Sequence, residues 1–295
     1  MNEFKAQYQA YADLLEQHLS RQCDRCFAPG SQVGAAARYS LLGGGKRVRG
    51  VLVLAFCELL GGDRSAALDF AGAIEMLHCY SLIHDDLPCM DNADTRRGQT
   101  SCHKKFGEST ALLAGDALLT AAFEAITAGC GTPAQKADAV AALAAAAGGH
   151  GMVYGQELDL CWEHRQPTEQ QLTELHSHKT GDLIHAAGLM GVASAPHSAA
   201  DLQACTDYTR AIGLVFQIVD DVLDCTASAA EMGKPVGSDA AAGKVTFATL
   251  LGVDAARARA AQLTQQACAR LETIYGAPRA AFLTALARSL ADRRS

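Results

Sequence analysis

Residues 73–91 read AIEMLHCYSLIHDDLPCMD, an apolar run with helical periodicity that ends in a cluster of aspartates. The cluster comprises Asp85, Asp86 and Asp91. Carboxylates packed this closely repel one another unless a cation lies among them, so the cluster is a candidate magnesium site. Pro88 cannot continue the helical hydrogen bonds. We therefore predict that the helix ends or unwinds near Pro88 and that Asp91 turns back towards Asp85.

A second apolar run, GLVFQIVDDVLD at residues 213–224, contains a second aspartate cluster. Gln217, Asp220, Asp221 and Asp224 fall on one face of an ideal helix, and that face is too polar for ordinary core. Both clusters have a plainer interpretation as solvated helix ends, although surface helices seldom place carboxylates after such apolar runs. The pattern favours a magnesium site at each cluster.

Helical periodicity dominates the rest of the chain, and strand-like alternation is almost absent. Glycine and proline breaks such as Gly43–Gly45, Gly129–Gly131 and Gly276–Pro278 separate helices of roughly 15 to 28 residues. We predict an all-α fold, a bundle of long helices around a central cavity, in a single domain over residues 1–295. In such a bundle we expect the two aspartate clusters to face one another.

Length and composition describe a globular protein with a sizeable core, because 49 % of its 295 residues are hydrophobic. The chain carries 25 Lys and Arg against 32 Asp and Glu, and its net charge of -7 argues against nonspecific nucleic-acid binding. The first residues lack the apolar core of a signal peptide, and no uninterrupted apolar run reaches about 18 residues. We therefore expect a cytoplasmic enzyme with no membrane span.

The 11 cysteines lie mostly in apolar helical segments, as expected of reduced and buried thiols. Cys23 and Cys26 form a lone CxxC motif, which has no second CxxC or CxxH with which to bind zinc. We interpret both thiols as packing groups near a helix end.

Magnesium prefers carboxylates together with phosphate oxygens and water, so the predicted metal sites indicate a diphosphate ester as the substrate. Basic residues that suit phosphate oxygens recur along the chain. They are Lys46, Arg49, Arg96, Arg97, Lys179, Lys234 and Lys244. Each one alone fits a flexible loop or a surface ion pair as well as a ligand site. Their order along the chain is more informative than any one of them.

A series of motifs covers about residues 39–255: GGGKRVR, HCYSLIHDDLPCMDNADTRRG, GQELDL, HKTGDLI, FQIVDDVLD, GKPVGSD and GKVTF. This order resembles the trans-isoprenyl diphosphate synthases, and the whole chain resembles the bacterial farnesyl diphosphate synthases among them. The resemblance implies the isoprenoid synthase fold, several Mg²⁺ ions per active site and a homodimer. It also implies a prenyltransferase reaction, in which an allylic diphosphate ionises, isopentenyl diphosphate attacks the carbocation and a proton is lost. The allylic substrates would be dimethylallyl and geranyl diphosphate, and the product (2E,6E)-farnesyl diphosphate.

The same resemblance supplies a role for each candidate site residue. The residues assigned to catalysis are Asp85, Asp91, Lys179 and Asp220. The metal ligands are these three aspartates, supported by Asp86, Asp221 and Asp224. The residues assigned to the allylic diphosphate are Arg96, Lys179, Thr180, Gln217, Lys234 and Lys244. Those assigned to isopentenyl diphosphate are Lys46, Arg49, His78 and Arg97.

Two residues before the first cluster bear on the length of the product. Along a helix, Tyr80 lies about 7 to 8 Å and Ser81 about 6 Å before Asp85. This position predicts that they form the floor of the prenyl pocket. A bulky Tyr80 beside a small Ser81 resembles the pattern of bacterial fifteen-carbon synthases. A large residue at 81 would favour ten carbons, and a small residue at 80 would open the pocket to twenty.

The chain departs from the family pattern at several positions. Gly50 replaces a common proline, which predicts a looser helix start, and Asn92–Asp94 make the first cluster less acidic than usual. Asp182 places a negative charge near the lysine of the HKTGDLI motif. Arg293 and Arg294 belong either to a solvated tail or to a segment that closes over the isopentenyl site.

Three alternatives to a farnesyl diphosphate synthase remain. A geranyl or geranylgeranyl diphosphate synthase of the same family differs only in the depth of its pocket. A terpene cyclase also ionises prenyl diphosphates in an all-helical fold, but it needs no isopentenyl site, and Lys46, Arg49 and Arg97 argue against it. A noncatalytic helical subunit should have lost one aspartate cluster, and both are present here.

Overall fold

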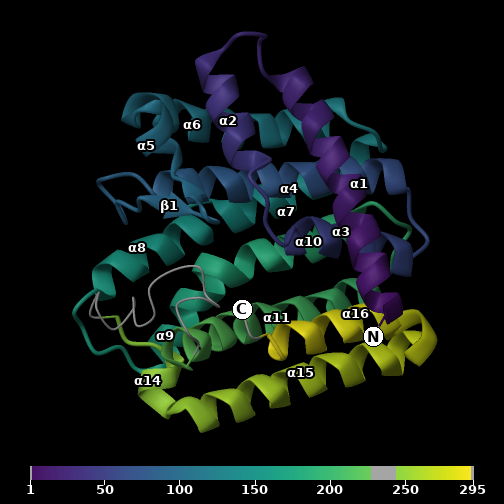
Figure 1. The fold of residues 1–295 in the computed structure, drawn as a ribbon. Helices are drawn as coiled ribbons and strands as arrows, with labels where there is room; N and C mark the ends of the chain where they lie inside the picture. Colours follow the sequence, from purple (N-terminus) through teal and green to yellow (C-terminus); the bar gives the residue numbers. More distant parts are fainter. Residues whose placement is uncertain (1, 227–243, 294–295) are drawn as a thin grey trace. The chain divides into compact units, whose positions relative to one another are not determined.

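The structure, a computed structural model, describes residues 2–226 and 244–293, and most of these residues are helical (Figure 1). The chain divides into two compact units. The N-terminal unit comprises Asn2–Ala141 and Met190–Pro196, and the C-terminal unit comprises Ala142–Leu189 and His197–Ser295. The predicted all-α class is confirmed, whereas the single domain stays a prediction.

The N-terminal unit is built around one central helix. Its elements are α1 (Asn2–Cys26), α2 (Gln32–Leu41), α3 (Val48–Leu59), α4 (Arg64–Asp85), β1 (Thr95–Arg96), β2 (Gln99–Thr100), α5 (Cys102–Phe106), α6 (Glu108–Ala128) and most of α7 (Pro133–Ala147). The central helix is α4, which packs against α1, α2, α3 and α6. Every residue from Ala66 to Leu77 is buried, including the charged Asp69 and Glu75, so α4 is enclosed on all sides. The core therefore fixes the helix that ends in the first aspartate cluster.

Two helices, α4 and α6, are long and apolar enough to cross a membrane. In α4, 83 % of the most apolar stretch is buried inside the protein, which is the burial expected of a core helix. In α6, 44 % of the corresponding stretch is buried. The absence of a membrane span therefore stays a prediction.

The C-terminal unit is organised around the long helix α11. Its elements are α8 (Met152–Trp162), α9 (Glu169–His176), the π-helix η1 (Ser177–Gly181), α10 (Asp182–Ala193, whose last residues belong to the N-terminal unit), α11 (Ala199–Thr226), α14 (Phe247–Leu251), α15 (Val253–Tyr275) and α16 (Ala277–Ala291). In Figure 1, α15 and α16 run alongside α11, and both contact it. The buried Tyr208 hydroxyl donates to the Leu283 carbonyl at 2.6 Å and joins α11 to α16.

The π-helix η1 contains Lys179 and Thr180 of the HKTGDLI motif. It continues α9 and leads directly into α10, so the three form one helical segment with a locally wider turn. Such π turns are frequent at functional sites, where the extra residue changes the direction of neighbouring side chains.

Candidate active site

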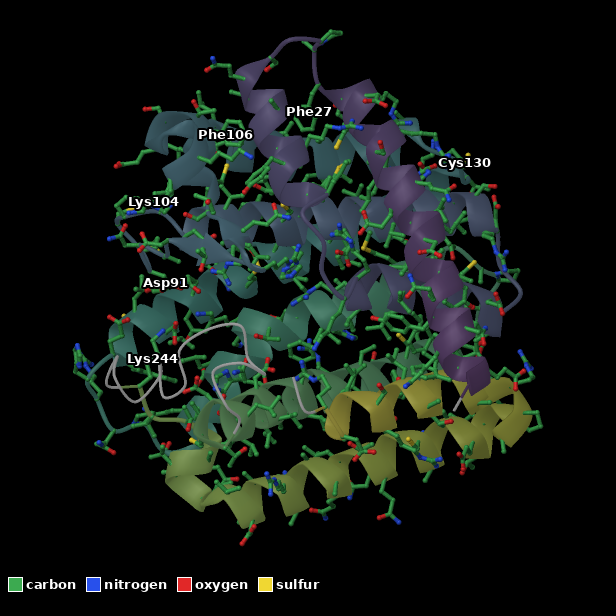
Figure 2. The ribbon with its side chains drawn as sticks, in the orientation of Figure 1. Phe27, Asp91, Lys104, Phe106, Cys130 and Lys244 are labelled. Atoms are coloured by element: carbon green, nitrogen blue, oxygen red, sulfur yellow. The ribbon has the colours of Figure 1, made fainter. Side chains whose placement is uncertain are left out.

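The first aspartate cluster lies in the turn that ends α4. The helix ends at Asp85, and the Asp91 amide donates to the Asp85 carbonyl at 2.9 Å. The predicted turn is thus confirmed, although the helix ends before Pro88. The exposed Asp91 lies at the end of the N-terminal unit opposite Cys130 (Figure 2). One backbone hydrogen bond therefore brings the two predicted metal ligands to adjacent positions.

Asp86, between these two aspartates, is paired with Arg96. The carboxylate is 2 % exposed and accepts from Arg96 Nε at 3.0 Å and Nη2 at 2.5 Å. Burial opposes the charge on Arg96, but the hydrogen bonds and the negative charge of Asp86 outweigh this effect and raise the pKa of Arg96. Asp86 therefore holds a basic residue of the site, which fits a supporting part rather than direct metal ligation.

Arg96 and Arg97 belong to a short antiparallel hairpin. Thr95 pairs with Thr100 and Arg96 with Gln99, which leaves Arg97 and Gly98 as a two-residue turn. Both turn residues have positive φ, 53° and 73°, as a type I′ turn requires. The two arginines thus lie at adjacent positions, Arg96 in the strand and Arg97 in the turn.

Arg97 contacts the glycine-rich motif before α3. Its Nη1 donates to the Gly44 carbonyl at 2.5 Å. A Cβ atom on Gly45 would lie 2.7 Å from the Arg97 Cζ atom, so a larger residue there would require the guanidinium to shift, and the φ of 127° at this position also favours glycine. The GGGKRVR and TRRG motifs, which are distant in sequence, thus meet in the N-terminal unit.

His78 lies close to the residues assigned to isopentenyl diphosphate. Burial, followed by the positive charges of Arg49 and Arg97, lowers the pKa of His78 well below its ordinary value. The imidazole is therefore neutral near pH 7 and can offer a hydrogen bond but no charge. Lys46 is exposed beside them, and its carbonyl accepts from the Tyr8 hydroxyl.

Arg47, within the same motif, has a structural part that the sequence did not predict. It is 4 % exposed, has a positive φ of 51°, and pairs with Glu16 at 2.6 Å and Glu75 at 3.3 Å. Glu75 also accepts from the Gly50 amide at 3.0 Å. The predicted loosening at Gly50 is wrong, because this amide ties the start of α3 to α4. Proline has no N–H to make that bond.

The second aspartate cluster divides into buried and accessible members. Asp221 is 2 % exposed and accepts from the Phe247 amide at 2.8 Å and from Gln217 Nε2 at 2.9 Å. Asp224 is equally buried. Asp220, by contrast, has a side chain that is 40 % exposed. Asp220 is therefore the carboxylate of this cluster that solvent reaches most readily.

Lys179 and Lys244 share one carboxylate oxygen. Asp159 Oδ2, from the GQELDL motif on α8, lies 2.6 Å from Lys179 Nζ and 2.9 Å from Lys244 Nζ. Burial raises the pKa of Asp159, but the two ammonium groups outweigh it and the net effect is a lowered pKa. The close packing of α8 on η1 depends on Gly155, where a Cβ would lie 2.1 Å from the Lys179 amide nitrogen.

Asp159 lies in the GQELDL motif, but no role was predicted for it from the sequence. The available signal was a carboxylate within a motif, in a chain whose other motifs contain lysines that could pair with it. Thr180 Oγ1 donates to Gln217 Oε1 at 3.3 Å, so two further residues assigned to the allylic diphosphate do meet. Lys234, assigned to the same substrate, lies outside the described residues.

The negative charge of Asp182 is paired with Arg210 and His178 rather than with Lys179. Its carboxylate accepts from Arg210 Nη1 at 2.5 Å and contacts His178 Nδ1 at 2.8 Å. Its charge is therefore balanced within the C-terminal unit.

Replacing Asp159 with Asn is expected to destabilise the protein by about 2 kcal/mol at pH 7, because two ammonium groups lose their shared partner. The pKa of Asp159 is lowered from 3.8 in the folded state, so its contribution is present above pH 3.8 and is lost as the pH falls further. Melting curves should therefore separate the wild type from Asp159→Asn at pH 7 and converge as the pH is lowered below 3.8. Glu157→Gln, an exposed position on α8, is the control. An equal loss in both variants at pH 7 would contradict the assignment.

The carboxylates fit magnesium that arrives with a diphosphate. Among the described residues no group of three or more His, Cys, Asp or Glu side chains is arranged to hold a metal ion. Mg²⁺ is commonly bound by only one or two carboxylates together with phosphate oxygens and water. Asp85 is half-buried, Asp91 exposed and Asp220 partly exposed, so all three offer accessible hard oxygen donors. Asp220 already has a cationic partner, Arg293, at 2.8 Å.

The sequence profile of the polyprenyl synthetase family matches residues 31–276. The chain belongs to this family. It is 46 % identical over 266 residues to geranylgeranyl pyrophosphate synthase 11, chloroplastic, of Arabidopsis thaliana, which covers 88 % of this chain and 74 % of that protein. It is 45 % identical over 262 residues to the chloroplastic geranylgeranyl pyrophosphate synthase of Capsicum annuum, covering 88 % and 70 %.

Solved structures of the family share the fold. An FPP/GFPP synthase from Zymomonas mobilis has a TM-score of 0.86 and 36 % identity, covering 98 % of this chain and 99 % of that one. A geranyltransferase from Helicobacter pylori, complexed with magnesium and isoprenyl diphosphate, has a TM-score of 0.83 and 33 % identity over 96 % of each chain. The protein is therefore a short-chain prenyltransferase with the all-α isoprenoid synthase fold. The relatives differ in the product named for them, so product length has to be argued from the pocket.

Proposed function

We propose that this prenyltransferase is a farnesyl diphosphate synthase. It would condense isopentenyl diphosphate with dimethylallyl diphosphate and then with geranyl diphosphate, and release (2E,6E)-farnesyl diphosphate. The observation that carries the fifteen-carbon assignment is the buried aromatic ring of Tyr80. This residue lies between one and two helical turns before Asp85 on α4.

Tyr80 is held firmly in place. It is 8 % exposed, and its ring meets the edge of the His84 ring at 5.6 Å between centroids and an angle of 82°. His84 is fixed in turn by α6, where its Nε2 lies 3.0 Å from the Leu112 carbonyl. Gly115 permits this approach, because a Cβ there would lie 2.1 Å from His84 Nε2. The ring thus has a rigid backing, as a pocket floor requires.

Ser81 is small, so it leaves the space above Tyr80 open. Its hydroxyl donates to the His78 carbonyl at 2.9 Å, one turn back along α4, so it adds no bulk of its own. A geranyl chain would then pass Ser81 and a farnesyl chain would stop at Tyr80. This arrangement supports fifteen carbons over ten.

The metal ligands in this proposal are Asp85, Asp91 and Asp220, with Asp86, Asp221 and Asp224 supporting them. When bound, the Mg²⁺ ions supply the positive charge that stabilises the departing diphosphate. Asp221 orients Gln217, and Asp86 orients Arg96, through the hydrogen bonds described above.

The basic residues hold the two substrates in distinct ways. Lys179 and Lys244 would exchange Asp159 for the oxygens of the allylic diphosphate, with Thr180 beside them. Lys46, Arg49 and Arg97 would bind isopentenyl diphosphate, with neutral His78 donating a hydrogen bond. The reaction needs no nucleophilic side chain, because the double bond of isopentenyl diphosphate attacks, and the proton can pass to the released diphosphate.

Geranylgeranyl diphosphate synthesis is the second candidate. It is favoured by the 46 % identity to a protein named as a geranylgeranyl pyrophosphate synthase. In that case the pocket would extend past Tyr80 towards α6. We also propose a cytoplasmic homodimer; the exposed side chains of Leu112 and Leu113 on α6 support the dimer.

Product analysis separates these candidates. The purified protein is incubated with Mg²⁺, isopentenyl diphosphate and, in turn, an allylic diphosphate of five, ten or fifteen carbons. We expect the first two to be converted to a fifteen-carbon product and the third to be left unextended, with no reaction in EDTA. A dominant twenty-carbon product would establish the second candidate instead. No prenyl transfer with any allylic substrate would contradict the enzyme assignment and favour a noncatalytic subunit.

A further inference from the structure

Arg293, just beyond α16, lies against the second aspartate cluster. Its Nη2 donates to Asp220 Oδ1 at 2.8 Å and to the Phe216 carbonyl at 3.0 Å. The guanidinium carbon also lies 4.0 Å from the centroid of the Phe216 ring. Its Nε donates to the Leu290 carbonyl at 3.3 Å, which ties the side chain back to α16. The interactions all lie within the C-terminal unit.

This contact differs from an ordinary surface ion pair. The Arg293 side chain is only 10 % exposed, while that of Asp220 is 40 % exposed. A guanidinium is always charged in proteins, and its position over an aromatic face and beside a carbonyl compensates for its burial. Exposed pairs contribute little, whereas partly buried charge-assisted hydrogen bonds are stronger.

Arg288, within the last turn of α16, provides the contrast. Arg288 pairs with Glu272 at 3.7 Å, and its side chain is 64 % exposed. It has the same charge and nearly the same place in the sequence, yet its partner is Glu272 of α15. The position of Arg293 on the metal ligand is therefore a property of that residue and not of a basic helix end.

We propose that Arg293 is an internal counter-cation of Asp220, which holds this carboxylate in place without metal and competes with Mg²⁺ for it. The inference rests on the proposed function, in which Asp220 is a metal ligand. A guanidinium and a magnesium ion are both cations and would use the same carboxylate oxygens, so each binds Asp220 at the expense of the other. Binding of Mg²⁺ together with a diphosphate releases Arg293 from Asp220.

The structure contradicts one of the two sequence interpretations of Arg293 and Arg294. Arg293 is not a solvated tail residue, since nine tenths of its side chain is buried. Closure of this segment over the isopentenyl site stays a prediction. Arg294 lies outside the described residues.

The test is a titration of the full chain with MgCl₂ in the presence of inorganic pyrophosphate, followed by calorimetry. Arg293→Gln should lower the half-saturating Mg²⁺ concentration by about fivefold, the effect of removing a partly buried charge pair of moderate strength. Arg288→Gln removes the same charge five residues earlier in the chain and should leave the value within about twofold of the wild type. Equal values for the two variants, or weaker Mg²⁺ binding by Arg293→Gln, would overturn the proposal.

A second pair of variants tests whether the effect passes through Asp220. In an Asp220→Asn background, the further change Arg293→Gln should leave the midpoint unaltered, because the competition has been removed. A full fivefold shift in that background would show a general charge effect and overturn the proposal.

The same variants separate this inference from the proposed function. If Asp220→Asn alone binds Mg²⁺ and pyrophosphate as tightly as the wild type, Asp220 is no metal ligand, and the metal assignment fails together with the inference. If Asp220→Asn weakens binding but Arg293→Gln behaves like Arg288→Gln, the inference alone fails. In metal-free buffer, Arg293→Gln should also melt at a lower temperature than Arg288→Gln, and the reverse order would contradict a stabilising contact.

Discussion

Alanine in place of Asp85 or Asp220 is expected to reduce turnover roughly a hundredfold to a thousandfold, because the charge that develops on the departing diphosphate loses a preplaced cation. Asp85 is the last residue of α4 and Asp220 is partly exposed on α11, so neither side chain belongs to a packed core. The helical fold should therefore survive both changes. Steady-state rates at saturating substrate, together with circular dichroism, measure the two effects separately.

Asp94→Ala provides a matched control for the first cluster. Its side chain lies in the same loop, is 82 % exposed and pairs with Lys104 at 3.0 Å, so its removal should cost little activity. Near-normal turnover in both Asp85→Ala and Asp220→Ala would contradict the metal roles. A loss equal to theirs in Asp94→Ala would show that the general acidity of the loop matters, rather than the ligands.

Tyr80→Ala should convert the main product from fifteen to twenty carbons. The substitution removes a ring that is 8 % exposed and backed by His84, so the pocket deepens by about the volume of that ring. Farnesyl diphosphate, which the wild type should not extend, then becomes a substrate. Chain length of the extracted and dephosphorylated alcohols is the measurement.

Changes at Ser81 test the same floor from the other side. Ser81→Phe should restrict the product to ten carbons, because a ring one residue closer to Asp85 blocks the geranyl chain. Ser81→Ala, which keeps the residue small, should leave the product at fifteen carbons. An unchanged fifteen-carbon product from Tyr80→Ala would contradict the pocket floor and would locate the length limit elsewhere.

The helix that ends in the first cluster was predictable because its signals are local. Periodic apolar residues up to Ile83 indicate a buried helix, and Pro88 requires that it stop. The hydrogen bond from the Asp91 amide to the Asp85 carbonyl follows from the same short segment. The all-α class was predictable for a similar reason, since the helical period recurs throughout the chain.

The hairpin and the π-helix were not predictable from such signals. Strands of two residues are too short to show alternation, and the Arg97-Gly98 pair of the turn resembled a phosphate-binding motif rather than a turn. A π turn adds a single residue to a helix that stays apolar on the same side, so the period of η1 gives no warning of it.

The ion pairs of the site were the feature that the sequence predicted least well. Residue types and motif order identify which groups suit a diphosphate, but not which of them bind one another without it. Asp159 with Lys244 and Asp220 with Arg293 join residues far apart in the chain, so their pairing depends on how helices pack. A sequence motif describes each partner only in its own local setting.

The glycine at the start of α3 constrains which substitutions the protein can accept. A side chain at Gly50 would place its Cβ 2.2 Å from Leu15 Cδ2, and proline would also leave Glu75 without its backbone donor. Proline at position 50 is therefore expected to be better tolerated when a smaller residue replaces Leu15 and another donor reaches Glu75. The order of such changes would matter. Proline alone is expected to destabilise the start of α3, whereas proline together with both compensating changes is expected to be tolerated. The position is thus a case of epistasis that has a physical origin in one contact and one hydrogen bond.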